Sequence, residues 1–549
     1  MKRYIFFIYI LFLTIAVKAQ TAIPKYEIRA VWLTTIGGLD WPRTYANNSV
    51  TIERQKQELR TILDLLKRAN VNTILLQTRV RATTIYPSMY EPWDGCLSGK
   101  PGTSPGYDAL QFAIDECHKR GMELHAWVVT IPVGKWNTLG CTLLRKKFPK
   151  LILKIGEEGY MNPESAQTGD YLANICGEIT RNYDVDGIHL DYIRYPETWK
   201  KKTNKPAGRS NITRIVSAIN RSVKSIKPWV KLSCSPVGKY DDLTRYMSRG
   251  WNANTTVCQD AQGWLRDGLM DALFPMMYFR DNNFFPFAID WAECSYGKII
   301  APGLAVYMLH PREQNWPLEV ITSELNVLRQ YKMGHTYFRS KFFTDNVKGV
   351  YQYVANQFDR YPALVPPMTW VSKTIPAKPV CLNIRDNRIS WHQPLNKPNA
   401  SGNTLLYNIY TSRQYPVDIN DARNLTVMRY QETTIEIPKL ADKGLFVAVT
   451  SIDRYGNESQ PLQMESGKQN VISKRLLKND GRKVQLPEKG KALDADYIVI
   501  ESLAGNIVAT KAYRETFVDI RDIHNGVYTV RTVGRKDISH RLGTMIIKR

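Results

Sequence analysis

The strongest constraint on the fold is an alternation of short apolar runs and helical stretches from Tyr26 to about Tyr361. Between the apolar runs, Glu53 to Ala69 has apolar residues at helical spacing, and Asp108 to Arg120 does so before Gly121 ends the pattern. Eight strands with intervening helices predict an eight-stranded β/α barrel of the TIM type. A doubly wound open sheet is the alternative, but no glycine-rich phosphate loop follows the first strand. The predicted strands are Arg29–Thr34, Thr73–Gln77, Glu123–Val129, Gly187–Asp191, Lys231–Ser235, Ala272–Met277, Ile299–Ala305 and Gly334–Phe338.

A change of pattern after residue 365 divides the chain into domains. Residues 366–378 contain three prolines and predict a linker, across which we expect few contacts. Beyond it, short alternating strands such as Tyr407–Tyr410 and Phe446–Asp453 are separated by polar turns, which is typical of a β-sandwich. We therefore predict an α/β barrel at 26–365 and two small all-β domains at 379–466 and 467–549.

The first 19 residues have the pattern of a secretory signal peptide. Lys2 and Arg3 precede the apolar run Tyr4–Val17, and a small-residue pattern ends at Ala19. The apolar run is shorter than the roughly 20 residues that a bilayer span needs, and no later segment is long enough either. The sequence therefore predicts an exported protein, periplasmic, cell-surface or secreted, without a transmembrane segment.

The net charge of +24 indicates attraction to a polyanion. Nucleic acid is disfavoured as the partner, because lysines and arginines are spread along the whole chain and the leader predicts export. An acidic glycan is the better candidate. Nothing in the sequence indicates an oligomeric state.

The eight cysteines indicate neither a zinc site nor a disulfide scaffold. They are scattered without CxxC pairs or histidines at ligand spacing, so we predict no metal site and mostly core thiols, with one or two disulfides left open. The sequence also lacks an HExxH motif and a phosphate-binding loop, and its GxSxG string, Gly102 to Gly106, does not follow a predicted strand as a nucleophile elbow does. We therefore predict no cofactor.

The segment Asp184–Pro196 carries the chemistry that stands out most. A short strand ends at Asp191, and Arg194 and Tyr195 follow at once. Working residues of a β/α barrel lie at the carboxyl ends of its strands. An isolated aspartate in a loop is by default a helix cap, but this run is longer than a cap requires, so we predict that Asp191 belongs to a site.

Eight motifs fall in register with the predicted strand ends. They are Arg29–Leu33, Asp40-Trp41-Pro42, the run from Gln77 through Arg81 to Ser88, His125–Trp127, Asp184–Pro196, Ser235-Pro236, Gln259-Asp260 with Trp264, and Pro275–Tyr278. These motifs resemble those of the glycosyl-hydrolase-like ten family. The resemblance covers about Tyr26 to Phe343 and implies a β/α barrel that cleaves glycans, bacterial cell-wall glycan strands among them. One departure is that many members carry two adjacent aspartates where this chain has Asp191-Tyr192, so the role of the second acid cannot be carried over.

The two β domains show weaker resemblances. The first looks like a fibronectin type III domain, through Trp391, Tyr407 and the run Val447–Ser459. The second is similar to C-terminal sorting domains of exported Bacteroidetes proteins, through Leu503–Val508 and Asn525–Arg531. Such modules usually tether, space or route an enzyme, so we expect no chemistry there.

Most glycosidases need two carboxyl groups, one that protonates the leaving oxygen and one that acts as nucleophile or base. Asp191 is the first candidate, and Arg194, if it folds back, would keep it ionised as a nucleophile or base. Asp281 and Asp40, which follow the sixth and first strands, rank equally as the second. Asp260, in the position of a helix N-cap, and Glu293 are weaker candidates.

Aromatic and basic residues at the strand ends fit a sugar site. Arg79, Arg81 and Arg194 are candidates to bind a substrate carboxylate by paired hydrogen bonds. His125 is a further candidate contact, although His125 and His189 both have the alternative of satisfying buried polar groups in the barrel, which we favour for His189. Burial is the alternative for each aromatic residue taken singly. The aromatic candidates are Trp32, Trp41, Trp127, Tyr195, Tyr278 and Tyr307.

These features and the resemblance together predict an exported glycoside hydrolase that uses paired carboxylates. Peptidoglycan glycan strands or another acidic polysaccharide are the expected substrates. The alternative is a non-catalytic carbohydrate-binding protein of the cell surface. A catalyst needs a second carboxyl group within glycosidase range of Asp191, whereas a binding protein needs only the aromatic residues.

Overall fold

The computed structural model describes most of the chain from residue 23 to residue 549. The predicted signal peptide lies outside the described residues. The described ranges are 23–199, 203–385, 387–393, 405–440, 444–463, 476–487, 495–502, 506–513, 516–534 and 539–549.

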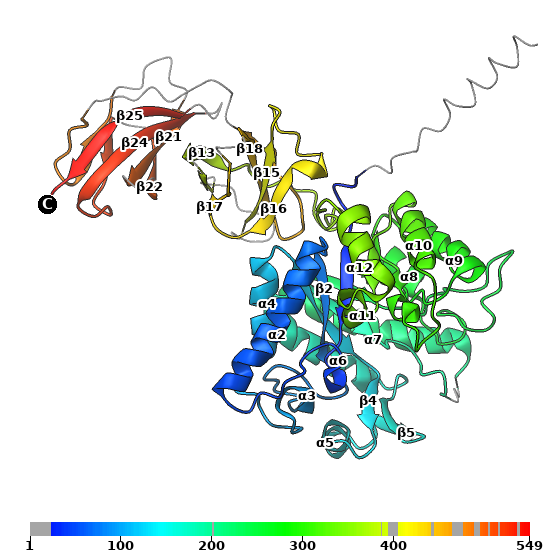
Figure 1. Cartoon of the computed structure of the whole chain (residues 1–549). Coiled ribbons are helices and arrows are strands. Elements are labelled where there is room, and N and C mark those ends of the chain that lie inside the picture. The colour runs from blue at the N-terminus through cyan, green and yellow to red at the C-terminus, as the bar shows by residue number, and fades with distance from the viewer. Residues whose placement is uncertain are drawn as a thin grey trace, which may run out of the picture.

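The first domain is a closed barrel of eight parallel strands, as predicted (Figure 1). Its seventh strand is broken at Pro302 into β10 and β11; β10 pairs with β9, and β11 pairs with β12. Because the two halves belong to one stretch of chain, this pairing closes the sheet. The strands are β1 (Arg29–Leu33), β2 (Thr73–Arg79), β3 (Glu123–Val129), β7 (Gly187–Asp191), β8 (Lys231–Cys234), β9 (Ala272–Leu273), β10 (Ile299–Ile300), β11 (Gly303–Leu304) and β12 (His335–Tyr337).

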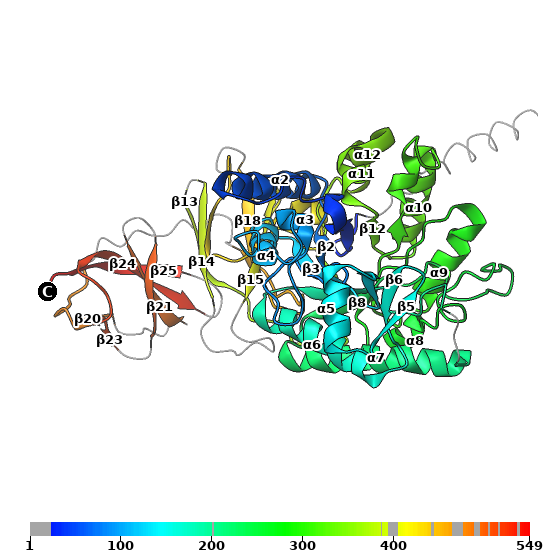
Figure 2. The same ribbon diagram turned by 90° about the horizontal axis from the view of Figure 1, so that it is seen from below.

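Helices surround the strands, and Figure 2 shows them around the barrel. The two predicted helices are present, and α2 begins before the predicted residue because Asn48 and Thr51 form a capping box. Asp108 caps α4 and Asn204 caps α7. The helices are α2 (Ser49–Arg68), α3 (Gly95–Ser98), α4 (Ala109–Lys119), α6 (Ala166–Asn182), α7 (Lys205–Ile226), α8 (Ala261–Arg266), α9 (Phe285–Glu293), α10 (Leu318–Gln330), α11 (Ser340–Thr344) and α12 (Val350–Tyr353).

The strands carry apolar side chains on both faces. One set, which includes Ala30, Trp32 and Phe274, forms a cluster of its own. The alternate residues, such as Val31, Leu33 and the helix residues that cover them, form the larger core. This two-sided burial explains why the strands appear in the sequence as nearly continuous apolar runs.

A small antiparallel sheet is inserted between β3 and α6. It contains β4 (Pro132–Lys135), β5 (Ile152–Ile155) and β6 (Glu158–Met161) in the order β4-β6-β5, with α5 (Leu139–Lys147) after β4. Figure 1 shows it at the end of the barrel opposite the two β domains. The insertion therefore extends the carboxyl face, here called the rim, which consists of the strand ends and the loops that follow them.

Both C-terminal domains are all-β, as predicted. The first has a three-stranded and a four-stranded antiparallel sheet around one core that includes Trp391 and Tyr407. The second has a four-stranded and a two-stranded sheet around a separate core. The strands are β13 (Val380–Arg385), β14 (Arg388–His392), β15 (Leu406–Ser412), β16 (Leu425–Tyr430), β17 (Thr434–Glu436), β18 (Phe446–Ile452), β19 (Leu462–Gln463), β20 (Lys483–Gln485), β21 (Ala495–Ser502), β22 (Ile507–Ala512), β23 (Phe517–Asp519), β24 (Gly526–Gly534) and β25 (Ser539–Ile547).

The first β domain is bound tightly to the amino end of the barrel, so the expectation of few contacts across the linker is wrong. Arg429 of β16 donates to Glu123 at 3.0 Å and to Asp186, and both acids are buried at the starts of barrel strands. In the linker itself, Trp370 donates to Asp271 at 2.9 Å. Buried carboxylates require partners, and here the neighbouring domain supplies them.

All eight cysteines lie within the described residues, and none of them is joined in a disulfide. Six of them are buried, as expected for core thiols. In the part of the chain that the structure describes, no helix is long and apolar enough to cross a membrane.

Candidate active site

Three neighbouring strand ends position the carboxylate of Asp191. Asp191 is the last residue of β7 and lies opposite Val129 of β3. Its Oδ2 accepts a hydrogen bond from Trp127 Nε1 at 3.1 Å. Its Oδ1 accepts from Ser235 Oγ at 2.9 Å and from the main-chain N–H of Tyr192 at 2.8 Å. Asp191 is therefore a fixed, buried acceptor at the centre of the rim.

Two opposing effects act on the proton affinity of Asp191. Burial raises its pKa above the usual value, and this exceeds the lowering by the Ser235 hydrogen bond, the Arg194 charge and the other two donors. The expected ion pair with Arg194 is absent from the described structure, because Arg194 Nη2 pairs with Glu197 at 2.6 Å instead. The pKa of Asp191 thus moves in the direction opposite to the one predicted.

Arg194 lies beneath Tyr192 and has unused hydrogen-bonding capacity. Its side chain is 3% exposed, and within the described residues its Nε and Nη1 have no hydrogen-bond partner. The Tyr192 ring covers the guanidinium at 4.7 Å. Tyr192 is 37% exposed and has a φ of 53°, which is uncommon for a residue with a side chain. Arg194 is thus a buried cation with two unused donor nitrogens within the described residues.

An aromatic wall stands on one side of Asp191. Tyr278, Tyr307 and Phe338 follow β9, β11 and β12, and all three are half-buried. Their ring centroids are 5.3 to 5.9 Å apart. Burial raises the pKa of Tyr278 well above its ordinary value, and the Asp191 charge adds to this, so the wall lies near Asp191. Phe338 was not predicted, because a lone phenylalanine at a strand end gives no signal of its role.

Charged residues from the inserted sheet and the loop after β7 meet on another side. Arg81 Nη1 lies 3.7 Å from Glu158 Oε2, and both side chains are partly exposed. Burial raises the pKa of Tyr160 on β6, the charges of Glu158 and Glu197 add to this, and the charge of Arg81 opposes it. Glu158 and Glu197 are therefore carboxylates of the rim that the sequence prediction missed. The two-residue turn Gly156-Glu157 between β5 and β6 was a usable hairpin signal.

The two predicted second acids lie elsewhere. Asp40 is buried, and its oxygens accept from Thr34 N at 2.8 Å, Thr34 Oγ1 at 2.7 Å, Lys341 N at 3.0 Å and Arg339. It joins the loops after β1 and β12 and has no oxygen left for a substrate. Asp281 is 80% exposed and lies 3.6 Å from Arg280. Its charge acts on Glu324 of α10, which places it outside the centre of the rim.

Four predicted aromatic contacts are buried instead. Trp32 Nε1 donates to His189 Nε2 at 3.1 Å, and Trp41 Nε1 donates to the main chain of Gln55 at 2.8 Å. Tyr195 is fully buried and accepts from Asn211 at 3.2 Å. Trp127 is 5% exposed and acts through its hydrogen bond to Asp191. Tyr278 and Tyr307 remain as sugar-facing candidates.

Two predicted polar contacts are structural as well. Arg79 is fully buried and makes a bidentate pair with Glu91 at 2.7 to 3.0 Å. His125 is fully buried and contacts Glu123 at 3.1 Å, at the amino end of the barrel. Of the predicted arginines, Arg81 and Arg194 remain at the rim.

His189 has the buried role that was favoured for it. Because the indole of Trp32 can only donate, His189 Nε2 accepts, and Nδ1 carries the proton that faces Ser233 Oγ at 3.1 Å. Burial holds the pKa of His189 well below its usual range. Among the described residues, no group of three or more His, Cys, Asp or Glu side chains is arranged to hold a metal ion.

Comparison with known proteins finds two named glycosyl hydrolases among the relatives of this chain. The chain is 26% identical over 477 residues to Glycosyl hydrolase YngK of Bacillus subtilis (strain 168). The aligned region covers 79% of this chain and 92% of that relative. It is 30% identical over 296 residues to Glycosyl hydrolase DigH of Escherichia coli (strain K12), covering 48% of this chain and 67% of that one.

A solved structure, alpha-L-fucosidase isoenzyme 2 from Paenibacillus thiaminolyticus, aligns with a TM-score of 0.41 at 14% identity, covering 63% of this chain and 50% of that chain. The family model described as Glycosyl hydrolase-like 10 matches residues 27–207 and 203–315, which together span more than half of the 549 residues. This chain therefore belongs to the glycosyl hydrolase-like 10 family.

Proposed function

We propose that this chain is an exported glycoside hydrolase that cleaves an acidic glycan, such as peptidoglycan glycan strands, with Asp191 as one of two catalytic carboxyl groups. The observation that carries the proposal is the placement of Asp191. It ends the fourth barrel strand, accepts three hydrogen bonds and lies beside half-exposed aromatic rings. Export rests on the signal-like pattern of Met1 to Ala19.

Asp191 is suited to act as the nucleophile or base. Three donors face its oxygens, and this arrangement stabilises the carboxylate over the neutral acid. Burial opposes them and raises the pKa, which makes the anion more basic than an ordinary aspartate. A nucleophile or base that is ionised and still reactive requires both effects.

The second carboxyl group comes from the rim, and Glu197 ranks ahead of Glu158. The Tyr192 phenol lies within the charge fields of both Asp191 and Glu197, and burial is the main cause of its raised pKa. Glu197 thus shares with Asp191 an effect on the Tyr192 phenol. Glu158 is not among the main charges that act on Tyr192 and lies beside Arg81.

The basic residues of the rim support an acidic substrate. Arg81 is 42% exposed, and Arg194 has two guanidinium nitrogens without a partner in the described residues. A planar guanidinium binds a carboxylate through two parallel hydrogen bonds. The wall of Tyr278, Tyr307 and Phe338 offers ring faces on which the apolar face of a sugar stacks.

The decisive experiment replaces Asp191 with asparagine and measures cleavage of peptide-free cell-wall glycan strands and of acidic polysaccharides. Asp191→Asn keeps size and shape, so we expect unchanged folding and glycan binding but a loss of turnover of at least about 10³-fold. Glu197→Gln and Glu158→Gln identify the second acid. Asp281→Asn is the matched control and should keep full activity.

Two outcomes would contradict the proposal. Full turnover by Asp191→Asn on a substrate that the parent cleaves would remove the mechanism. A parent that binds glycans but cleaves none would make the chain a carbohydrate-binding protein.

A further inference from the structure

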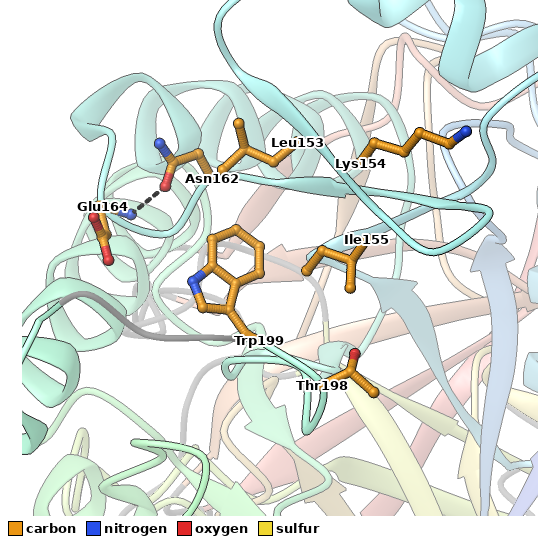
Figure 3. Close-up of a pocket in the computed structure, with 7 residues that line it drawn as sticks. All are labelled: Leu153, Lys154, Ile155, Asn162, Glu164, Thr198 and Trp199. Carbon is orange, nitrogen blue, oxygen red and sulfur yellow. Dashed lines mark hydrogen bonds between the residues drawn. The ribbon is translucent and has the colours of Figure 1, made fainter.

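A cavity of about 550 Å³ opens on the rim beside the inserted sheet. It is lined by Leu153 to Ile155 of β5, by Asn162 and Glu164 after β6, and by Thr198 and Trp199 in the loop after β7 (Figure 3). These segments follow the carboxyl ends of the adjacent strands β3 and β7. The cavity therefore lies on the same face of the barrel as Asp191.

The wall of this cavity combines an aromatic surface with unused polar groups. Trp199 is half-buried, and its ring contacts that of Tyr195 edge-on at 5.8 Å, which fixes its orientation. The Asn162 Oδ1 accepts from the main-chain N–H of Glu164 at 3.0 Å. Within the described part of the chain, the Asn162 amide nitrogen, the Glu164 carboxylate and the Trp199 indole nitrogen have no hydrogen-bond partner.

We propose that this cavity is a second sugar subsite, which holds an uncharged residue of the glycan away from the point of cleavage. This inference rests on the proposed function. The Trp199 ring stacks on the apolar face of the sugar, the Glu164 carboxylate accepts from a hydroxyl group, and the Asn162 amide donates to an oxygen. A mixed wall of aromatic and directed polar groups is the common design of such sites.

The charge of the wall sets the kind of sugar. Glu164 repels an anionic sugar, and the Lys154 ammonium points away from the cavity in Figure 3 and lies 3.7 Å from Glu157. The charges of Arg81 and Arg194, in contrast, act on the Tyr192 phenol together with the charge of Asp191. The substrate therefore has its acidic group near Asp191 and an uncharged unit at Trp199. A chain long enough to occupy both places binds more tightly than a short one.

The test measures the binding of oligosaccharides of increasing length to the full chain carrying Asp191→Asn, which prevents turnover. The probes are peptide-free cell-wall glycan oligosaccharides of two to eight units and uncharged chitin oligosaccharides of the same lengths. Adding Trp199→Ala should raise the Kd of the longest probes of both kinds about tenfold, equivalent to ~1.4 kcal/mol, and leave the shortest unchanged. Trp199→Phe should retain most of the affinity. Lys119→Ala, at an exposed position of α4 outside the cavity, is the control and should bind like the parent.

Each result either supports or overturns the subsite. An equal loss at all lengths, or no loss at any length, would overturn it, as would a Trp199→Ala effect limited to acidic probes. The melting temperature of Trp199→Phe shows whether folding is intact. If the parent binds long probes but cleaves none, the catalytic proposal fails while the length dependence still decides the subsite. If the parent cleaves glycans and Trp199→Ala changes nothing, the catalytic proposal stands and the subsite fails.

Discussion

At the scale of single residues, the hydrogen bond from Ser235 to Asp191 controls when the site is ionised. It is the largest of the effects that lower the pKa of Asp191 against the raising effect of burial. In Ser235→Ala, the acid limb of kcat/KM should therefore move to higher pH, with activity near the parent level above it. Thr130→Ala is the control, because Thr130 Oγ1 donates only to the main-chain oxygen of Asp191.

A pH profile decides between the two possible roles of Asp191. If the alkaline limb moves in Ser235→Ala and the acid limb does not, Asp191 is the proton donor and not the nucleophile or base.

Glu324 is a buried acid whose ionisation opposes folding. It lies on α10 and is 1% exposed, and both of its carboxyl oxygens lack a partner in the described residues. Burial, with a contribution from Asp281, raises its pKa well above the usual value. The stabilisation that protonated Glu324 gives is complete below the pKa of glutamate in the unfolded chain, about 4.3. It is lost as the pH rises through the pKa of Glu324 in the folded protein.

Glu324→Leu should therefore stabilise the protein at pH 7 by about 1–3 kcal/mol, as expected when an unpaired buried polar group is removed. Glu324→Gln should remove the pH dependence between mildly acidic and neutral pH. Urea unfolding of both variants at several pH values checks this, with the exposed Glu319→Gln on the same helix as control. A parent whose stability is constant over this range would contradict the assignment.

Sequence alone located Asp191 but misplaced several of its expected neighbours. Strand ends follow from apolar periodicity, so the residue that ends β7 was predictable. What a strand-end side chain contacts was not, because the partners are distant in sequence or fold back locally. Arg79 pairs with Glu91 from the loop that follows it, and His125 bonds to Glu123 two residues earlier.

At the scale of elements, β16 completes the amino end of the barrel. Burial alone would raise the pKa of Glu123, but Lys231 and Arg429 outweigh it and lower the pKa to about 2. The stabilisation by ionised Glu123 is complete above the pKa of glutamate in the unfolded chain. It is lost as the pH falls from that value, about 4.3, to the pKa of Glu123 in the folded protein, about 2.

Removing the Arg429 side chain should leave the buried carboxylates of Glu123 and Asp186 each with one ion-pair partner fewer. Arg429→Met should therefore cost about 3–5 kcal/mol of the free energy of unfolding, as is usual when one member of a buried ion pair is removed. The matched control is Arg423→Met, because Arg423 is 60% exposed and pairs with Asp421 on the surface, so we expect no measurable loss of stability. Equal effects of the two variants would show that β16 does not support the barrel.

Sequence predicted the barrel strands well and the contact between domains poorly. The apolar runs determine strands wherever both faces are buried. The sequence does not indicate that an arginine of a β domain neutralises acids of the barrel. A proline-rich stretch is also typical of a flexible linker, although here Trp370 and Met368 form hydrogen bonds with the neighbouring domains.

At the scale of the whole molecule, these contacts make the barrel depend on the domain that follows it. Leu364 follows the last helical turn of the barrel. Its main chain forms hydrogen bonds with the main chains of Lys25 and Glu27, just before β1. A chain that ends at Tyr361 lacks these bonds and also loses Trp370, Arg429 and Arg454, the last of which pairs with Asp184 at 2.6 Å. Four carboxylates of the barrel, those of Glu123, Asp184, Asp186 and Asp271, would lose partners together.

A chain ending at Tyr361 should therefore melt at least about 10 °C below the full chain, by the usual relation between unfolding free energy and melting temperature. A chain ending at Gln463 keeps the first β domain and should melt close to the full chain, because the core of the last domain is separate. Thermal unfolding of the three chains checks this, and Arg429→Met in the full chain separates the loss of one ion pair from the loss of the interface. If the shortest chain melts with the full chain, the barrel is independent of the β domain and the interface contributes little to its stability.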